Sequence, residues 1–70
     1  MSMNELEIKS KLYHRFECEV DRLGQDEVGR IIGVDQPNIS RAINHPDMVS
    51  ISWFIDALKK LGFEITITIR

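Results

Sequence analysis

The sequence contains little of what builds covalent, metal or membrane sites. Its single cysteine, Cys18, has no partner for an internal disulfide, and its two histidines are not spaced with further ligands as in a metal site. No apolar run approaches the ~20 residues of a membrane helix. The first residues, MSMNELEIKSK, are polar and mixed in charge, unlike a signal peptide. We therefore predict a reduced, cytoplasmic protein with no cofactor, no metal and no membrane partner.

Catalytic motifs are also lacking. The chain has no paired acid and base, nucleophile elbow or phosphate-binding loop, so we predict that it is not an enzyme. An excess of basic residues is lacking too: the net charge is −2, whereas nucleic-acid-binding domains are commonly basic. The charge is uneven, however, because after Asp56 only Glu64 is acidic, against Lys59, Lys60 and Arg70. An acidic chain can still present a local basic surface.

What the chain does have is helical periodicity over most of its length. Seventy residues indicate one domain, 1–70, at the small end of chains that fold without help, where oligomerisation often adds stability. Apolar residues recur every three or four positions in four segments, which predicts helices over about 4–23, 25–32, 36–43 and 51–61. Glycine follows three of these segments, Asp35 suits a helix N-cap, and Ser50 or Ser52 suits another.

The last eight residues, FEITITIR at 63–70, change to a period of two. Apolar and polar residues alternate there, which predicts a half-buried strand. A lone strand leaves backbone donors and acceptors unpaired, and the chain has no second strand of matching pattern. We therefore predict a homodimer in which this strand pairs with its copy. The dimerisation residues would be Phe63, Ile65, Ile67 and Ile69.

The stretch GRIIGVDQPNISRAIN, 29–44, interrupts one short helix and starts another. Two short helices set at a steep angle by a glycine turn form a helix-turn-helix. Gly29 falls in mid-helix, where glycine costs roughly 1 kcal/mol relative to alanine, so a close approach of the two helices should offset it. Gly33 falls at the turn, where a positive φ is wanted. Gln36, Asn38 and Arg41 would then project outward from the second helix of the motif.

At these residues the sequence resembles a known family. QDEVGRIIGVDQPNISRAIN, about 25–44, is similar to the helix-turn-helix of Cro/XRE-type transcriptional regulators, a group that includes small phage repressors. Gln25 and Gln36 match the glutamines that open the two motif helices, and Gly29 replaces the usual alanine. SWFIDALKKLG resembles the fourth helix of the family, and some members, antitoxin-like ones among them, carry a strand such as FEITITI. The resemblance implies a mainly α, four- to five-helix Cro/repressor-like domain with a C-terminal β-strand that pairs across a dimer.

The resemblance also implies a function. It points to a sequence-specific DNA-binding transcriptional regulator, a repressor that binds a palindromic operator as a homodimer through the major groove. Glutamine and asparagine can pair with adenine, and arginine with guanine or phosphate. Gln25 and Asn44 match positions that contact the DNA backbone. The DNA-binding residues implied are Gln25, Gln36, Pro37, Asn38, Arg41 and Asn44.

An alternative function remains open from the residues alone. The acidic charge and the C-terminal strand also suit a small protein-binding module, or an antitoxin whose main partner is another protein such as a toxin. Trp53 lies off the apolar face of its helix, which indicates either an interface or a cover for the strand. Glu27 is interpreted as pairing with Arg15 or Arg22, or as an exposed acid.

Overall fold

The computed structural model describes residues 4–66 of the chain. In this range the chain forms four α-helices and one short 3-10 helix, with no strand. Their bounds, in chain order, are α1 (Glu5–Leu23), α2 (Gln25–Ile32), α3 (Gln36–Asn44), η1 (Pro46–Met48) and α4 (Ile51–Lys60). Each bound of the four α-helices lies within one residue of the bound predicted from the sequence, so the mainly helical fold is confirmed.

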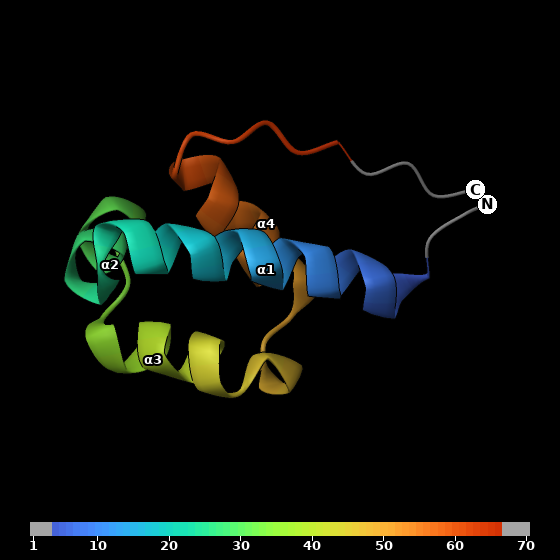
Figure 1. Cartoon of the computed structure of the whole chain (residues 1–70), viewed down its shortest axis with the longest axis horizontal. Coiled ribbons are helices and arrows are strands. Elements are labelled where there is room, and N and C mark those ends of the chain that lie inside the picture. Colours follow the sequence, from blue (N-terminus) through green and yellow to red (C-terminus); the bar gives the residue numbers. More distant parts are fainter. Residues whose placement is uncertain (1–3, 67–70) are drawn as a thin grey trace.

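The helix α1 is the longest element and forms the spine of the domain (Figure 1). It packs against α4 and α2, and α2 in turn packs against α3. In the view of Figure 1, α3 lies below α1, while α4 and the segment that follows it lie above. The two helices of the predicted motif, α2 and α3, therefore form one end and one side of the molecule.

Local signals in the sequence explain where the helices begin and end. The side chain of Asn4 accepts a hydrogen bond from the backbone N–H of Glu7 at 2.9 Å, which caps α1. Ser50 caps α4 by accepting from the N–H of Trp53 at 3.2 Å, which decides between the two serines proposed. Gly33 ends α2 with φ of 75°, in the left-handed region that favours glycine.

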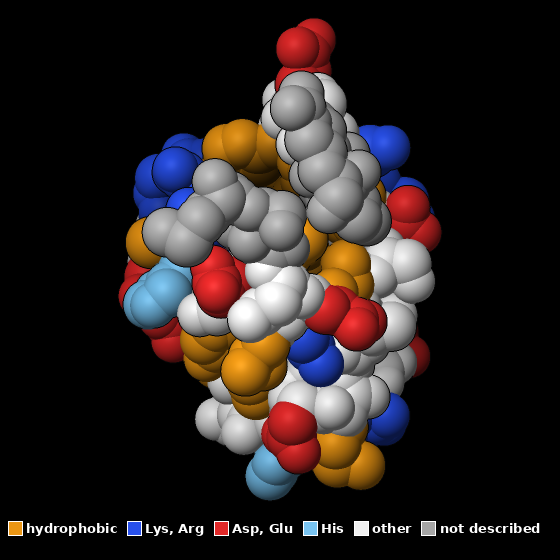
Figure 2. All heavy atoms as spheres, turned by 90° about the vertical axis from the view of Figure 1, so that its right-hand side faces the viewer, with side chains coloured by type: hydrophobic (Ala, Val, Ile, Leu, Met, Phe, Trp, Pro, Cys, Tyr) orange, Lys and Arg blue, Asp and Glu red, His pale blue; other side chains and the backbone are white. Residues whose placement is uncertain are grey.

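The surface mixes charges of both signs with a few exposed hydrophobic side chains. Among the described residues, large hydrophobic side chains are exposed at Leu6, Ile31 and Met48. Figure 2 shows the face at the right-hand end of Figure 1, where hydrophobic side chains lie between acidic and basic ones. Side chains of both charges lie among the described residues of that face (Figure 2).

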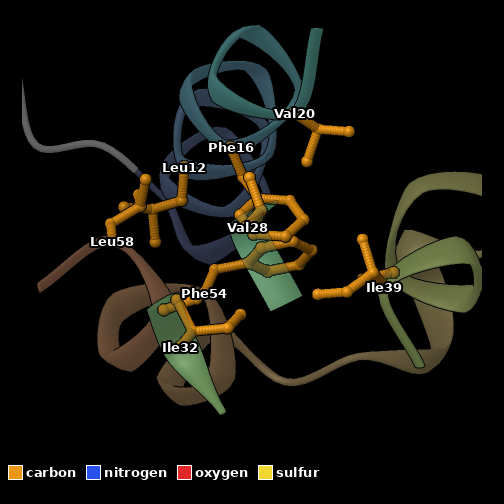
Figure 3. Close-up of a cluster of buried hydrophobic side chains, with 10 residues drawn as sticks. Leu12, Phe16, Val20, Val28, Ile32, Ile39, Phe54 and Leu58 are labelled. Atoms are coloured by element: carbon orange, nitrogen blue, oxygen red, sulfur yellow. The ribbon is translucent and has the colours of Figure 1, made fainter. Parts of the chain in front are cut away.

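The hydrophobic core draws residues from all four α-helices. The rings of Phe16 and Phe54 are fully buried and meet edge to face, with centroids 5.7 Å apart. Figure 3 shows Ile39 pointing toward these rings from α3, and Ile39 is also fully buried. Because full burial of such a side chain contributes about 1.5–3 kcal/mol, Ile39 helps to hold α3 on the domain.

Trp53 takes part in this core instead of standing exposed. It is half-buried, and its ring meets those of Phe16 and Phe54 edge to face, each at a centroid distance of 5.4 Å. The sequence interpretation that placed Trp53 off the apolar face of its helix is therefore wrong, and its two suggested roles, an interface or a cover for the following segment, stay predictions. The helix pattern misplaced it because a large ring at the edge of an apolar face can turn toward the core.

The segment after α4 was predicted to be a strand, and its described part, 63–66, has no regular secondary structure. Phe63 and Ile65 are half-buried and pack against the core of the same chain. The guanidinium of Arg15 lies 5.5 Å from the centre of the Phe63 ring, a cation–π contact that ties the segment to α1. Ile67 and Ile69, the other two predicted dimerisation residues, lie outside the described residues.

Candidate nucleic-acid interface

The junction between α2 and α3 is a tight turn of defined geometry. The carbonyl oxygen of Gly29 accepts hydrogen bonds from the N–H groups of Gly33, at 2.8 Å, and Val34, at 2.9 Å. These two bonds supply donors to a carbonyl group of the last turn, where a helix otherwise leaves its carbonyl groups without partners. The turn folds back on α2, so the close neighbour of Gly29 is the turn itself, where the sequence had suggested the facing helix.

The helix α3 starts where the sequence predicted, but the predicted N-cap residue does not use its side chain to cap the helix. Asp35 is the N-cap residue, yet its side chain makes no capping hydrogen bond. Its backbone carbonyl accepts instead from the N–H groups of Asn38, at 3.0 Å, and Ile39, at 3.1 Å. The carboxylate still favours the positive end of the helix dipole. It also places a negative charge beside Gln36, which any anionic partner of α3 must tolerate.

All of the polar residues predicted to contact DNA from α3 are exposed. Pro37, Arg41 and Asn44 are separated by four and three positions, so they share the outward face of the helix. Gln36 and Asn38 flank this face. The structure therefore brings the predicted contact residues of α3 together on one accessible surface. We call this surface the α3 face, made of Gln36, Pro37, Asn38, Arg41 and Asn44.

A groove runs along each side of the α3 face. The first, of about 280 Å³, lies between the N-terminal ends of α2 and α3 and is lined by Gln25, Arg30 and Gln36 among others. Gln25 is the first residue of α2 and is half-buried, so it lies beside the face without belonging to it. The second groove, of about 570 Å³, lies between α3 and the start of α4, and Asn38 and Arg41 line it. We call these the α2 groove and the α4 groove.

Positive charge near the α3 face is sparse. Arg30, in the α2 groove, forms a bidentate ion pair with Glu27 of its own helix. The hydrogen bonds of this pair, together with the attraction between the opposite charges, lower the pKa of Glu27 and raise that of Arg30. Arg41 makes no ion pair with the described residues. It is therefore the available cation on the α3 face.

The ion pairs differ from those suggested by the sequence. Glu27 was interpreted as a partner of Arg15 or Arg22, but it binds Arg30 three positions later. Arg22 binds Glu19, also at a spacing of three, with its Nη2 atom 2.7 Å from a carboxylate oxygen. Ion pairs within one helix form in preference to pairs between helices, because side chains three residues apart on a helix are already neighbours. A pair between two helices forms only where the packing of those helices brings the two side chains together.

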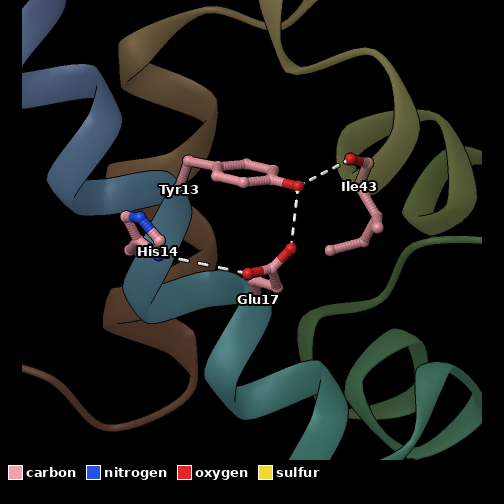
Figure 4. Close-up of polar contacts among 4 residues, drawn as sticks. All are labelled: Tyr13, His14, Glu17 and Ile43. Atoms are coloured by element: carbon pink, nitrogen blue, oxygen red, sulfur yellow. Dashed lines mark hydrogen bonds and ion pairs between the residues drawn. The ribbon is translucent and has the colours of Figure 1, made fainter.

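A hydrogen bond fixes the C-terminal end of α3 against α1. The hydroxyl of Tyr13 donates to the backbone carbonyl of Ile43 at 2.8 Å, and a carboxylate oxygen of Glu17 lies 3.0 Å from the same hydroxyl (Figure 4). Burial, together with the Glu17 carboxylate, raises the pKa of Tyr13. The bond satisfies one of the carbonyl groups that a helix end leaves without a partner. The α3 face is thus held at both ends, by the turn and by Tyr13.

One residue beside the α3 face, Met48, was missed by sequence reasoning. Met48, on η1, is 73% exposed and lines the α4 groove together with the half-buried Trp53. The sequence offered one signal for Met48, its place in the short NHPDMVS loop that directly follows the motif. The way that loop turns back beside Arg41 leaves no periodic pattern in the sequence.

The comparisons with known proteins agree with this geometry. A family model described as a helix-turn-helix domain matches residues 2–70. The chain belongs to this helix-turn-helix family. The comparisons with curated proteins and with solved structures gave no match. Within residues 4–66, no helix is both long enough and apolar enough to cross a membrane.

Proposed function

We propose that the protein is a sequence-specific DNA-binding transcriptional regulator that places α3 in the major groove. The observation that carries the proposal is the α3 face itself. Five exposed positions of one helix are polar or proline, and the opposite side of that helix is anchored by the fully buried Ile39 and Ala42. A rigid helix with a polar, accessible face is what major-groove contacts require.

The five polar residues among those predicted contact different parts of the DNA in this proposal. Gln36 and Asn38 contact base edges, because an amide side chain can pair with adenine through two hydrogen bonds. Arg41 contacts guanine or a phosphate, and it supplies the available positive charge on the α3 face. Gln25 contacts a phosphate together with the free N–H groups at the start of α2. Asn44 donates to Ser40 at 3.1 Å and is placed to contact the backbone from the same face.

A repressor acting as a dimer is the form that best fits a domain of this size. Two copies related by a two-fold axis would present two α3 faces to half-sites about 34 Å apart. The segment 63–70 is the proposed contact, through Phe63, Ile65, Ile67 and Ile69. Support comes from the alternating apolar and polar residues of its sequence.

The test is selection of bound sites from random DNA, followed by titration of the recovered site. We expect an enriched site with two-fold symmetry. Gln36→Ala should then weaken specific binding by about 1–3 kcal/mol while binding to random DNA changes little. Ser10→Ala, an exposed and uncharged change on α1, is the matched control. If selection enriches no sequence, the alternative of a protein-binding module or antitoxin becomes the better account.

A further inference from the structure

Met48 stands out among the exposed hydrophobic residues because of its position. Its side chain is 73% exposed, and it lines the α4 groove beside Asn38 and Arg41 of the α3 face. Ile31, another exposed hydrophobic residue, lines neither groove. A single exposed methionine needs no explanation elsewhere on a surface, but this one borders the surface to which DNA binding has been assigned.

The backbone around Met48 is fixed relative to α3. The N–H of His45 donates to the carbonyl of Arg41 at 2.7 Å, so η1 continues directly from the last turn of α3. The N–H of Met48 then donates to His45 at 3.0 Å. The ammonium of Lys9 on α1 lies 3.5 Å from the carbonyl oxygen of Asp47. These bonds hold the base of the side chain in place, while its flexible thioether arm remains free to adapt.

The surroundings of Met48 indicate what it would contact. The α4 groove combines the polar ends of Asn38 and Arg41 with the apolar Val49 and Trp53. In the major groove, base edges offer hydrogen-bonding groups and one apolar feature, the C5 methyl group of thymine. An amide, a guanidinium and a thioether that line one groove therefore match a base-pair step that contains a thymine.

From this arrangement, which rests on the proposed DNA-binding function, we propose that Met48 is a specificity-determining residue that contacts the methyl group of a thymine. The thymine lies next to the base pair contacted by Asn38 or Arg41. The preference at that position arises from burial of the methyl group against the thioether and not from a hydrogen bond. It is a contact that charge and hydrogen-bonding patterns in the sequence do not reveal.

The experiment combines protein variants with DNA that lacks single methyl groups. Each thymine of the selected site is replaced in turn by deoxyuridine, which removes only the C5 methyl. The wild-type protein should lose about three- to fivefold in affinity at one flanking position, the effect expected for one buried methyl group. Met48→Ala and Met48→Gln should lose affinity for the thymine site and show no further loss with deoxyuridine at that position. Met48→Leu should keep the sensitivity.

Ile31→Ala, an exposed hydrophobic residue outside both grooves, serves as the control and should respond to deoxyuridine as the wild type does. Equal losses for wild type and Met48→Ala at every thymine would overturn the role of Met48 while leaving DNA binding intact. If the wild-type protein binds no DNA sequence preferentially, the proposed function and this inference both fail. Thermal melts of the variants show that each is folded, since an exposed side chain contributes little to stability.

Discussion

A Cβ atom at Gly29 would lie 2.6 Å from the backbone carbonyl oxygen of Val34, closer than real Cβ contacts come. The next neighbour, the Cγ1 atom of Ile39 on α3, would be 3.6 Å away, an ordinary contact. The crowding therefore comes from the turn and not from the facing helix. It accounts for a glycine at this position, even though glycine weakens a helix by roughly 1 kcal/mol.

Gly29→Ala should destabilise the domain by about 1–3 kcal/mol, because the backbone oxygen it meets cannot turn away as a side chain would. Urea unfolding followed by circular dichroism measures this change. Gly33 offers a contrast, since an added Cβ there meets nothing within 4 Å and only the positive φ opposes substitution. Gly33→Asn should therefore be milder than Gly33→Ala, because asparagine tolerates that conformation. A Gly29→Ala variant as stable as wild type would show that the turn can widen freely.

Gly29 and Gly33 show which features of the motif could be predicted from the sequence and which could not. The helix ends were predictable because capping residues and apolar spacing are local, and they place α2 and α3 correctly. The need for a small residue at Gly29 was predictable, but its cause was not, because the neighbouring carbonyl belongs to the backbone of a turn. The exposure of the α3 face followed from periodicity, whereas the grooves beside it depend on how η1 and α4 fold back.

Side-chain partners were the least predictable part of the structure. The ring of Trp53 turns into the core, and the Asp35 carboxylate makes no capping bond, although both had different roles in the sequence interpretation. Tyr13 gave no signal at all, since its acceptor is the backbone carbonyl of Ile43, thirty positions later. Each of these side chains has several possible partners of similar energy, and a single sequence does not show which of them is nearest in the folded chain.

Tyr13→Phe should cost about 0.5–1.5 kcal/mol, the usual net contribution of one hydrogen bond, while its ring keeps the edge-to-face contact with Phe54. Thermal or urea unfolding measures the loss. Glu17→Gln is the matched variant. A tyrosine hydroxyl has one proton to donate, and an amide at position 17 could donate to its oxygen while the hydroxyl donates to Ile43. We expect Glu17→Gln to be near neutral. Equal losses for both variants would mean that the Glu17 contact matters as much as the carbonyl.

Glu27→Gln should strengthen binding to random DNA. The change removes a negative charge beside the α2 groove and releases Arg30 from its ion pair, so Arg30 becomes available to a phosphate. Each added phosphate contact steepens the plot of log affinity against log salt by about 0.9. Fluorescence anisotropy at several salt concentrations gives both quantities. Glu5→Gln, with the same change in net charge but on the first turn of α1, is the control, and an equal effect there would mean that only overall charge matters.

The ion pair of Glu19 and Arg22 predicts a dependence of stability on pH. Glu19 is buried at 7% exposure, and its bonds to Arg22 lower its pKa. A lowered folded-state pKa contributes stability that is present above the unfolded value, about 4.3 for glutamate, and is lost as the pH falls through the folded value. Melting temperatures of wild type and Glu19→Gln should therefore converge as the pH is lowered below about 4.5. A gap that stays constant from pH 7 to pH 3 would contradict this assignment.

Deleting the residues after Gly62 is not a specific test of the proposed dimer. Truncation after Gly62 would remove Phe63 and Ile65, which pack against the core of their own chain, so a truncated chain could lose stability for reasons unrelated to dimerisation. Thr66 is a better site because its side chain is exposed. Proline there removes a backbone N–H that a paired strand would need, without removing an apolar contact.

Sedimentation at micromolar concentration should show a dimer for the wild type and for Thr66→Ala, and a monomer for Thr66→Pro. The unpaired alternation of 63–70 is the reason: pairing with a second copy across a two-fold axis satisfies its backbone groups and closes the assembly. Circular dichroism should show the same helical content for all three, because the helices end at Lys60. If Thr66→Pro remains dimeric, the dimer contact must lie outside the segment 63–70. If the wild-type protein is monomeric, the proposed dimer is wrong. The monomeric variant should also bind a single half-site and lose the gain in affinity from the second, a result that would link the segment 63–70 to operator recognition.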